Sequence, residues 1–172
     1  MPRVLADGTT RYVIFETKPE DPTKITVTEF AAAKNASDNV LSTGFQFGPG
    51  ELGTVDEKPI SKKGTVQAPG DQSANVGGTI FRYFTEAGIP DPEADWLFDL
   101  HREVGNTVYA AALRSRGKPS AEAVVAGEEY NYIEYTTGQV MDQDDATGWV
   151  KNPFTGLPQE YHFNQKVVAA TP

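Results

Sequence analysis

The sequence predicts a single, mostly β domain, and three observations predict it. The 172 residues fall in the size range of one domain. Hydrophobic residues make up 38% of the chain and include seven Tyr and nine Phe, which is enough apolar mass for a buried core. Short β-forming runs recur between clusters of turn-forming residues, as in β-sandwiches and barrels and unlike βαβ folds. We therefore expect one β-sandwich or barrel over residues 1–172.

Seven segments have the composition of strands. In the last one, Tyr161, Phe163 and Val167 share one face and polar residues share the other, as expected for a half-buried strand. In residues 79–84 bulky side chains occur on both faces, which indicates a strand that is covered on both sides. The predicted strands are residues 11–16, 25–28, 44–47, 76–84, 107–114, 128–137 and 161–168.

Residues 91–104 have the pattern of an α-helix that flanks the sheet. Asp91 suits the N-cap, Pro92 suits the first helical position, and Gly105 supplies the stop. Apolar residues recur at helical spacing through this segment and form a stripe that has to pack on a sheet. A helical turn within residues 30–40 is also compatible with three consecutive alanines, although the Asn residues there disfavour it.

Three stretches between the predicted elements are rich in turn-forming residues. The longest, residues 48–75, holds three Pro and the basic pair Lys62-Lys63, and loops of this length are usually functional or disordered. Residues 115–127 form a second break, and residues 142–156 form a third with a local acidic cluster. We expect residues 48–75 to be a long loop that serves the function of the protein.

Charge and composition exclude several classes of function. With 24 acidic and 15 basic residues, the formal charge of −9 repels phosphate backbones, so sequence-reading nucleic-acid binding is disfavoured. The absence of Cys excludes disulfides, zinc–thiolate sites and thiol catalysis. Neither a signal peptide nor a membrane span is predicted. We expect a protein that is made and folded in a cytoplasm and has no membrane partner.

Patterns that carry catalysis or bind cofactors were tested and are not supported. Residues 48–53 fit G-x-G-x-x-G, but no helix is predicted to follow and Pro49 removes a donor, so a turn or bulge is favoured. Residues 142–145 begin like a calcium loop, yet the later ligand positions hold unsuitable residues. His101 and His162 are too few for a metal cluster, and His101 is interpreted as a surface residue of the helix. We expect no enzyme activity, cofactor or metal.

The order of the predicted elements carries a resemblance to a known family. The strand segment at 78–84 follows the long loop, and an Ala87-Gly88 turn, the helix with Trp96 and the closing segment at 161–168 come after it. This order resembles the major tail tube protein of long, flexible-tailed, siphovirus-type bacteriophages. The resemblance covers roughly residues 11–169 and includes no invariant motif.

The resemblance implies a structural protein of the virion tail that is assembled in the host cytoplasm. Subunits of that family form hexameric rings that stack into a hollow tube, with strands of each subunit in a continuous inner sheet. A long loop bridges to the adjacent ring, which implies residues 48–75 as the assembly loop. Residues 1–8 lie outside the resemblance and are a candidate N-terminal arm. Tape measure, terminator and distal tail proteins are further implied partners, and DNA passes through the lumen into the host without sequence-specific binding.

Candidate residues follow from this picture. Carboxylates on the lumen wall offer DNA no phosphate contacts, so the genome can slide without being retained. An ordinary solvated outer face explains each candidate equally well. The lumen-lining candidates are Glu128, Glu129, Glu134, Asp56 and Glu57, and the candidates for assembly contacts are Glu51, Asp56, Lys62, Lys63 and Asp71.

Three alternative functions remain open at this point. Another tail or head-closure subunit, such as a tail terminator, or a secretion-system tube protein would share the same sandwich. An acidic β-sandwich could also be a carbohydrate-binding module, in which Trp149 and Tyr135 stack on sugars, although such modules are commonly secreted. An enzyme ranks third, because no nucleophile, base and orienting residue can be proposed together.

Overall fold

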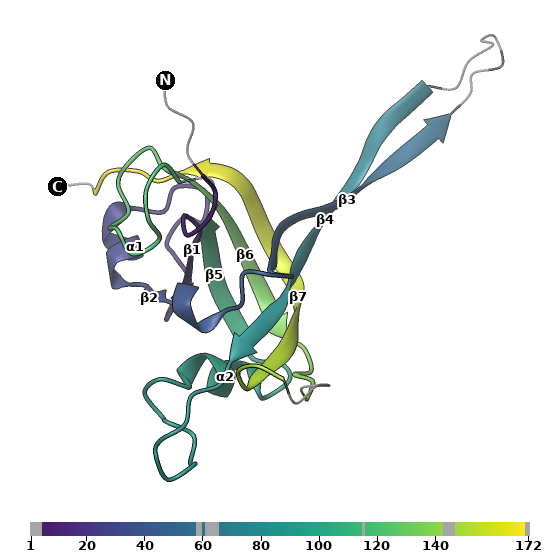
Figure 1. Cartoon of the computed structure of the whole chain (residues 1–172). Helices are drawn as coiled ribbons and strands as arrows, with labels where there is room; N and C mark the ends of the chain where they lie inside the picture. Colours follow the sequence, from purple (N-terminus) through teal and green to yellow (C-terminus); the bar gives the residue numbers. More distant parts are fainter. Residues whose placement is uncertain (1–4, 58–59, 61–65, 115, 143–146, 171–172) are drawn as a thin grey trace.

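The computed structural model describes residues 5–57, 60, 66–114, 116–142 and 147–170, and these residues form one antiparallel sheet (Figure 1). The sheet has seven strands in the order β2-β1-β5-β6-β7-β4-β3. The mostly β fold predicted from the sequence is confirmed. In sheet order, the strands are β2 (Lys34–Asn35), β1 (Arg11–Phe15), β5 (Thr107–Leu113), β6 (Glu129–Thr137), β7 (Lys151–Lys166), β4 (Val66–Phe81) and β3 (Gln46–Glu57).

The sheet curls toward itself. At one end of the curl, the backbone N–H of Ala36 donates to the carbonyl of Tyr12 at 2.8 Å. The chain then passes through a 3-10 turn (Ser37–Asn39) and reaches β4, where the N–H of Leu41 donates to the carbonyl of Thr79 at 2.9 Å. This connecting segment lies between β1 and β4, so the sheet has the character of the predicted sandwich or barrel without a closed strand ladder.

Apolar side chains cover both faces of the central strands. Tyr12 and Ile133 are buried on the face that packs against α2 (Trp96–His101). Val13 and Leu113 are buried on the opposite face, against α1 (Val27–Ala32). Successive residues of a strand point to opposite faces, so alternate positions of β1 and β5 supply two separate cores. This arrangement explains why β5 reads as a nearly continuous apolar run.

Helix α2 is shorter than the predicted helix over residues 91–104. Asp91 caps a turn instead of the α-helix, because its Oδ1 accepts from the N–H groups of Glu93 and Ala94 at 2.9 and 3.2 Å. The α-helix starts only after Asp95, whose carboxylate accepts from the Arg82 side chain and from the N–H of Tyr83, directly after the end of β4. The tertiary contact of Asp95 therefore sets the helix start.

Helix α1 replaces the strand that was predicted at residues 25–28, so that prediction was wrong. Thr26 Oγ1 accepts from the N–H of Glu29 at 3.2 Å, and Glu29 Oε2 accepts from the N–H of Thr26 at 2.8 Å. This reciprocal pair is a capping box, which satisfies two N–H groups at a helix start. It outweighs the β preference of Ile25 and Val27.

The predicted long loop over residues 48–75 is instead mostly β-hairpin. Strands β3 and β4 are paired from the base of the hairpin, where Gln46 lies opposite Gly77, to the far end, where Glu57 lies opposite Val66. The hairpin projects away from the body (Figure 1). Register shifts accompany the turn-forming residues, and the two backbones come close where a Cβ on Gly70 would lie 3.0 Å from the carbonyl oxygen of Gly53. The glycines that predicted a loop thus permit a tight, irregular hairpin. We call residues 49–57 and 66–75 the hairpin arm.

The remaining strand predictions agree with the structure to within a few residues at most boundaries. Strands β1, β5 and β6 match the predicted segments closely. Strand β7 starts at Lys151, inside the stretch predicted as a third loop, and is therefore longer than the predicted segment 161–168. Among the helices of the described residues, none is long and apolar enough to span a membrane.

Candidate assembly surfaces

The hairpin arm presents the side chains of residues 49–54 and 69–75, fully or in part, to solvent. Strand β3 is the last strand of the sheet, and Leu52 on it is 55% exposed. The arm is held at its base, where Phe47 and Val76 are buried and the Tyr161 hydroxyl donates to the carbonyl of Gln72. A long strand at a sheet edge is a template for pairing with another chain, so the arm is a candidate contact surface.

The predicted assembly residues lie along or beyond this arm. Glu51 and Asp71 are exposed on β3 and β4. Asp56 pairs through its backbone with Gln67 near the far end of the described hairpin. Lys62 and Lys63 lie outside the described residues. Of the predicted N-terminal arm, residues 5–8 are described and exposed, and the Gly8 carbonyl accepts from Ser120 N–H at 2.9 Å.

The sheet forks where the arm leaves the body. Within the described strands, β7 pairs with β4 only over residues 151–156, while residues 66–75 of β4 pair only with β3. Gly156 stands at the fork, and a Cβ there would lie 2.5 Å from Tyr135 Cδ2 and 2.7 Å from Val76 Cγ1. The fork exposes strand edges on both β7 and β4, and unpaired edges are where a second chain can add strands.

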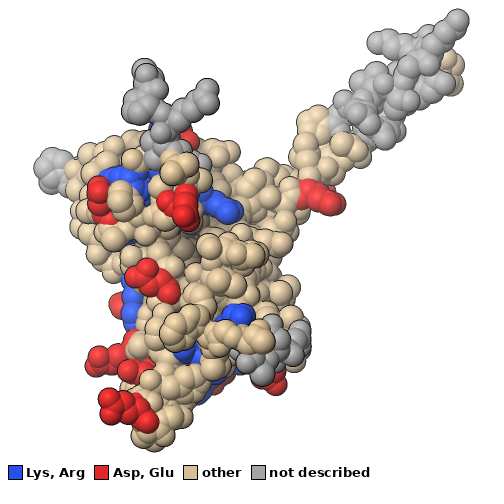
Figure 2. Space-filling model, viewed as in Figure 1, with Lys and Arg blue, Asp and Glu red and all other residues tan. Residues whose placement is uncertain are grey.

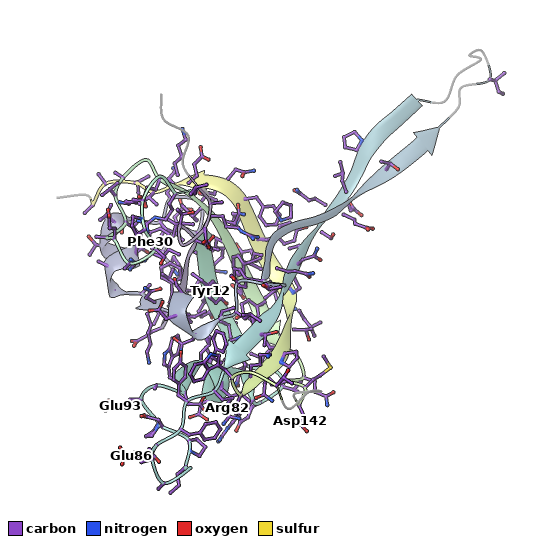
Figure 3. The ribbon with its side chains drawn as sticks, viewed as in Figure 1. Tyr12, Phe30, Arg82, Glu86, Glu93 and Asp142 are labelled. Atoms are coloured by element: carbon purple, nitrogen blue, oxygen red, sulfur yellow. The ribbon has the colours of Figure 1, made fainter. Side chains whose placement is uncertain are left out.

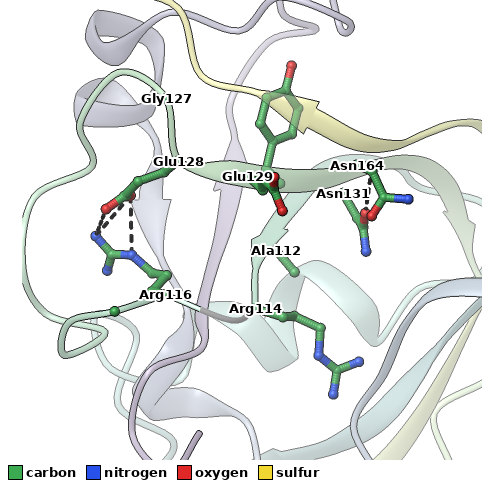
Figure 4. Close-up of a pocket in the computed structure, with 10 residues that line it drawn as sticks. Ala112, Arg114, Arg116, Gly127, Glu128, Glu129, Asn131 and Asn164 are labelled. Atoms are coloured by element: carbon green, nitrogen blue, oxygen red, sulfur yellow. Dashed lines mark hydrogen bonds and ion pairs between the residues drawn. The ribbon is translucent and has the colours of Figure 1, made fainter. Parts of the chain in front are cut away.

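Two of the predicted lumen-lining residues, Glu128 and Glu134, form ion pairs with Lys or Arg side chains of the same chain. Glu128 accepts from Arg116 Nη2 at 3.2 Å, a contact drawn in Figure 4, and from Lys118 Nζ at 2.7 Å. Burial acts to raise the pKa of Glu128, but the bonds from Lys118 and Arg116 outweigh it and lower the pKa below its usual value. Glu134 lies 2.9 Å from Lys18 Nζ, which also lies 2.5 Å from Glu160.

Sequence reasoning missed the role of Arg116. Its guanidinium is buried and fixes the loop over residues 116–128 by donating to several backbone carbonyls and to Glu128. No local pattern marks an arginine for this role, because the carbonyls it binds are positioned only when the loop folds. The carbonyls that Arg116 binds belong to Pro119, Ser120, Glu122 and Ala123.

Glu129, the next residue after Glu128 and another lumen candidate, is exposed at the start of β6.

A groove with aromatic side chains lies at the end of the body from which the arm points away (Figure 3). It has a volume of about 540 Å³. Trp149 is 80% exposed, Val150 is 51% exposed and Phe84 is 44% exposed. We call it the aromatic groove; its lining residues are Asp38, Phe81, Arg82, Tyr83, Phe84, Trp149 and Val150.

An ion pair fixes the wall of the aromatic groove. Arg82 donates from Nε and Nη2 to Asp95 Oδ2, both at 2.9 Å, and Asp95 is buried. The Arg82 guanidinium also lies 3.5 Å from the ring centre of Phe98. The Arg82 N–H donates to the carbonyl of Val150 at 2.9 Å, which joins the two sides of the groove. The groove is therefore held in shape by contacts beneath it.

His101 lies in the core, so its interpretation as a surface residue was wrong. Its Nδ1 donates to the carbonyl of Leu97 at 2.8 Å, and its Nε2 accepts from the Tyr135 hydroxyl at 2.8 Å. The Tyr135 hydroxyl lies 3.0 Å from that of Tyr12. Burial lowers the pKa of His101 to about 4, so the ring is neutral at pH 7.

The same network bears on the carbohydrate alternative. Tyr135 is fully buried and bonded to His101, so it cannot stack on a sugar. Of the two aromatic residues proposed for that role, Trp149 is exposed in the aromatic groove. Across the described part of the chain, no group of three or more His, Cys, Asp or Glu residues is arranged to hold a metal ion.

Comparisons with known proteins bear on the identity of these surfaces. A family model described as phage tail tube protein matches residues 1–171. A search of curated proteins finds no match. The family match spans the body, the hairpin arm and the aromatic groove.

Proposed function

This chain belongs to the phage tail tube protein family, and we propose that six copies close into a ring and that rings stack into a tube. Membership makes the chain a structural component of a phage tail that assembles with other subunits. The siphovirus-type tail is compatible with this membership. Ring size, lumen chemistry and DNA conduction are the parts that we propose.

The forked sheet is the observation that carries the proposal. A lone subunit exposes strand edges along β7, along β4 and along the terminal strand β3. Such edges favour pairing with another chain, and closing a ring of identical subunits removes them without leaving free ends. The arm supplies a second, different contact along the tube axis. A head-to-tail contact that repeats along an axis produces a filament.

We propose an acidic lumen through which DNA passes into the host during ejection. The net charge of −9 and the exposed Glu129 support a negative wall, which offers phosphate groups no attractive contacts. Asp56 and Glu57 at the end of β3 are further candidates for this wall. Glu128 and Glu134 contribute less net charge in this role, because cations of the same chain pair with them.

The remaining parts of the proposal concern place and partners. Assembly occurs in the host cytoplasm, and the finished tube contacts tape measure, terminator and distal tail proteins. The subunit acts by shape and charge and performs no catalytic step. DNA passes without sequence-specific contacts, in keeping with the acidic balance of the chain.

Electron microscopy of the concentrated, purified protein tests the proposal. We expect hollow tubes with six-fold rings in cross-section. Isolated rings that never stack would favour the terminator alternative. A monomer that persists under every polymerising condition would overturn the proposal, and glycan-array binding by that monomer would favour the carbohydrate-binding alternative.

A further inference from the structure

We infer that the aromatic groove receives the hairpin arm of a second copy of this chain in the adjacent ring. The inference deepens the proposed function and rests on it. It assigns the receiving surface to Phe84, Trp149 and Val150, and it assigns Leu52 to the entering arm.

Three large apolar side chains are exposed together in the groove, and their exposure to water is unfavourable in a monomer. Phe84 and the adjacent pair Trp149 and Val150 lie on two separate segments of the chain, and the fold brings these segments together in the groove. Burying large aromatic side chains is a main source of binding energy in protein interfaces. A contiguous exposed apolar patch of this kind marks an interaction site more often than an ordinary surface.

Two of the polar side chains that line the groove, Arg82 and Tyr83, are already bonded within the chain. Arg82 is paired with the buried Asp95, and the Tyr83 hydroxyl donates to the carbonyl of Asp38 at 3.0 Å. Sugar and other small polar ligands require precisely placed polar groups that are free to bind them. The groove therefore fits an apolar protein segment better than a carbohydrate.

The position of the groove identifies that segment as the arm of another copy. The arm points away from the end of the body where Arg82 and the groove lie (Figures 1 and 3). When subunits stack in one orientation, the projecting part of one copy meets the opposite end of the next. A receiving surface is therefore needed at the end that carries the groove.

Leu52 is the residue of the arm that suits an apolar groove. Leu52 is more than half exposed, although nothing in the monomer requires an exposed leucine there. The described arm contains no Lys or Arg but carries carboxylates such as Glu51 and Asp71, so Leu52 enters the groove while these side chains stay in water at its rim. The guanidinium of the groove is neutralised by Asp95, so it needs no new partner.

Cysteine cross-linking tests this contact directly, because the chain has no Cys of its own. The double variant Leu52→Cys/Val150→Cys carries one thiol on the arm and one in the groove. The matched control is Leu52→Cys/Val125→Cys, since Val125 and Val150 are valines with the same exposed fraction, 51%, and Val125 lies in the loop over residues 116–128. Assembled tubes are treated with a short bifunctional maleimide and separated under denaturing conditions.

We expect a ladder of covalent multimers from Leu52→Cys/Val150→Cys and at least a tenfold lower yield from the control. Equal yields, or no ladder from tubes that microscopy shows to be intact, would overturn the inference and leave the proposed function standing. If the unmodified chain forms no tubes, the proposed function and this inference fail together.

Tryptophan fluorescence gives a second measurement that needs no cross-link. In the variant Trp96→Phe, Trp149 is the remaining tryptophan. We expect its emission to shift to shorter wavelength and its quenching by acrylamide to fall several-fold when tubes form, because the ring leaves water. Unchanged emission in intact tubes would overturn the inference. A shift without the ladder would mean that another part of the second copy covers the groove, which overturns the assignment of the arm.

Discussion

His101 shows how one residue can be misread from its neighbours in sequence. Asp99 and Glu103 flank it on the same predicted helix, which suggests a solvated face. In the structure His101 is buried, and Tyr135 of β6 and Phe154 of β7 contact its ring. Its partners come from strands that are more than 30 residues away in sequence. The sequence spacing of charged residues therefore carried no information about its burial.

Protonation of His101 should destabilise the fold in acid. The pKa falls from 6.5 to about 4 on folding, so the unfolded chain binds the proton first. The contribution of neutral His101 to the free energy of unfolding is complete above pH 6.5 and is lost as the pH falls to about 4. The difference between a pKa of 6.5 in the unfolded chain and about 4 in the folded chain corresponds to about 3 kcal/mol.

Urea unfolding of the wild type and of His101→Gln between pH 7 and pH 4 measures this effect. Acidic groups titrate in both proteins, so the difference between the two slopes isolates the histidine. We expect the variant to be less stable at pH 7 but to lose less stability on acidification. Parallel curves would contradict the role assigned to His101.

Gly156 lies at a position where the neighbouring side chains leave no room for a Cβ. A Cβ at this residue would meet Tyr135 and Val76 at less than 3 Å. We expect Gly156→Ala to lower the free energy of unfolding by about 1–3 kcal/mol through overpacking. Gly117→Ala is the matched control, because nothing lies within 4 Å of the Cβ it would add. Urea denaturation that gave equal losses for both variants would show that the crowding at the fork is not the cause.

At the scale of elements, local sequence patterns predicted most of the strands but not the hairpin arm or α1. Strands β1, β5 and β6 are confirmed because apolar and β-forming residues are concentrated within each segment. The arm has Gly and Pro at positions that normally interrupt strands. Pairing between β3 and β4 overrides that preference, and a single-segment pattern cannot show pairing.

Removing the arm should separate folding from assembly. We expect replacement of residues 50–73 by Asn-Gly to leave the body intact, because Phe47 and Val76 keep their core contacts and a two-residue turn can close the shortened hairpin. The free energy of unfolding should change by less than about 2 kcal/mol, since the described side chains of the removed segment lie outside the buried cores.

Circular dichroism and electron microscopy of the shortened protein report on the two properties separately. A folded protein that forms no stacked tubes is the expected result. Loss of the β spectrum would show that the arm is part of the folding unit. Tubes of normal length would show that stacking does not need the arm.

At the scale of the whole molecule, charge opposes assembly. Each copy carries a formal charge of −9, and acidic side chains gather at the end of the body that carries Glu86 and Glu93 (Figures 2 and 3). The described arm is also acidic. Stacking therefore brings like charges together, and apolar contacts have to overcome their repulsion.

Assembly should consequently increase with ionic strength. The Debye length falls from about 30 Å at 0.01 M salt to about 10 Å at 0.1 M, which screens this repulsion. Sedimentation of the protein across this range should show a rising fraction in tubes, and NaCl and KCl at equal ionic strength should act alike. A falling fraction would indicate that ion pairs between subunits dominate the interface.

Local patterns suffice for the mostly β class, the positions of the central strands and the acidic character, since these depend on residue type and on alternation within short segments. The fork at Gly156, the burial of His101 and the aromatic groove depend on contacts between distant segments, such as the bond from Arg82 to Val150. Each of these features requires the strand order of the folded sheet, which no single segment encodes. The surfaces through which copies of this chain meet belong to this second group.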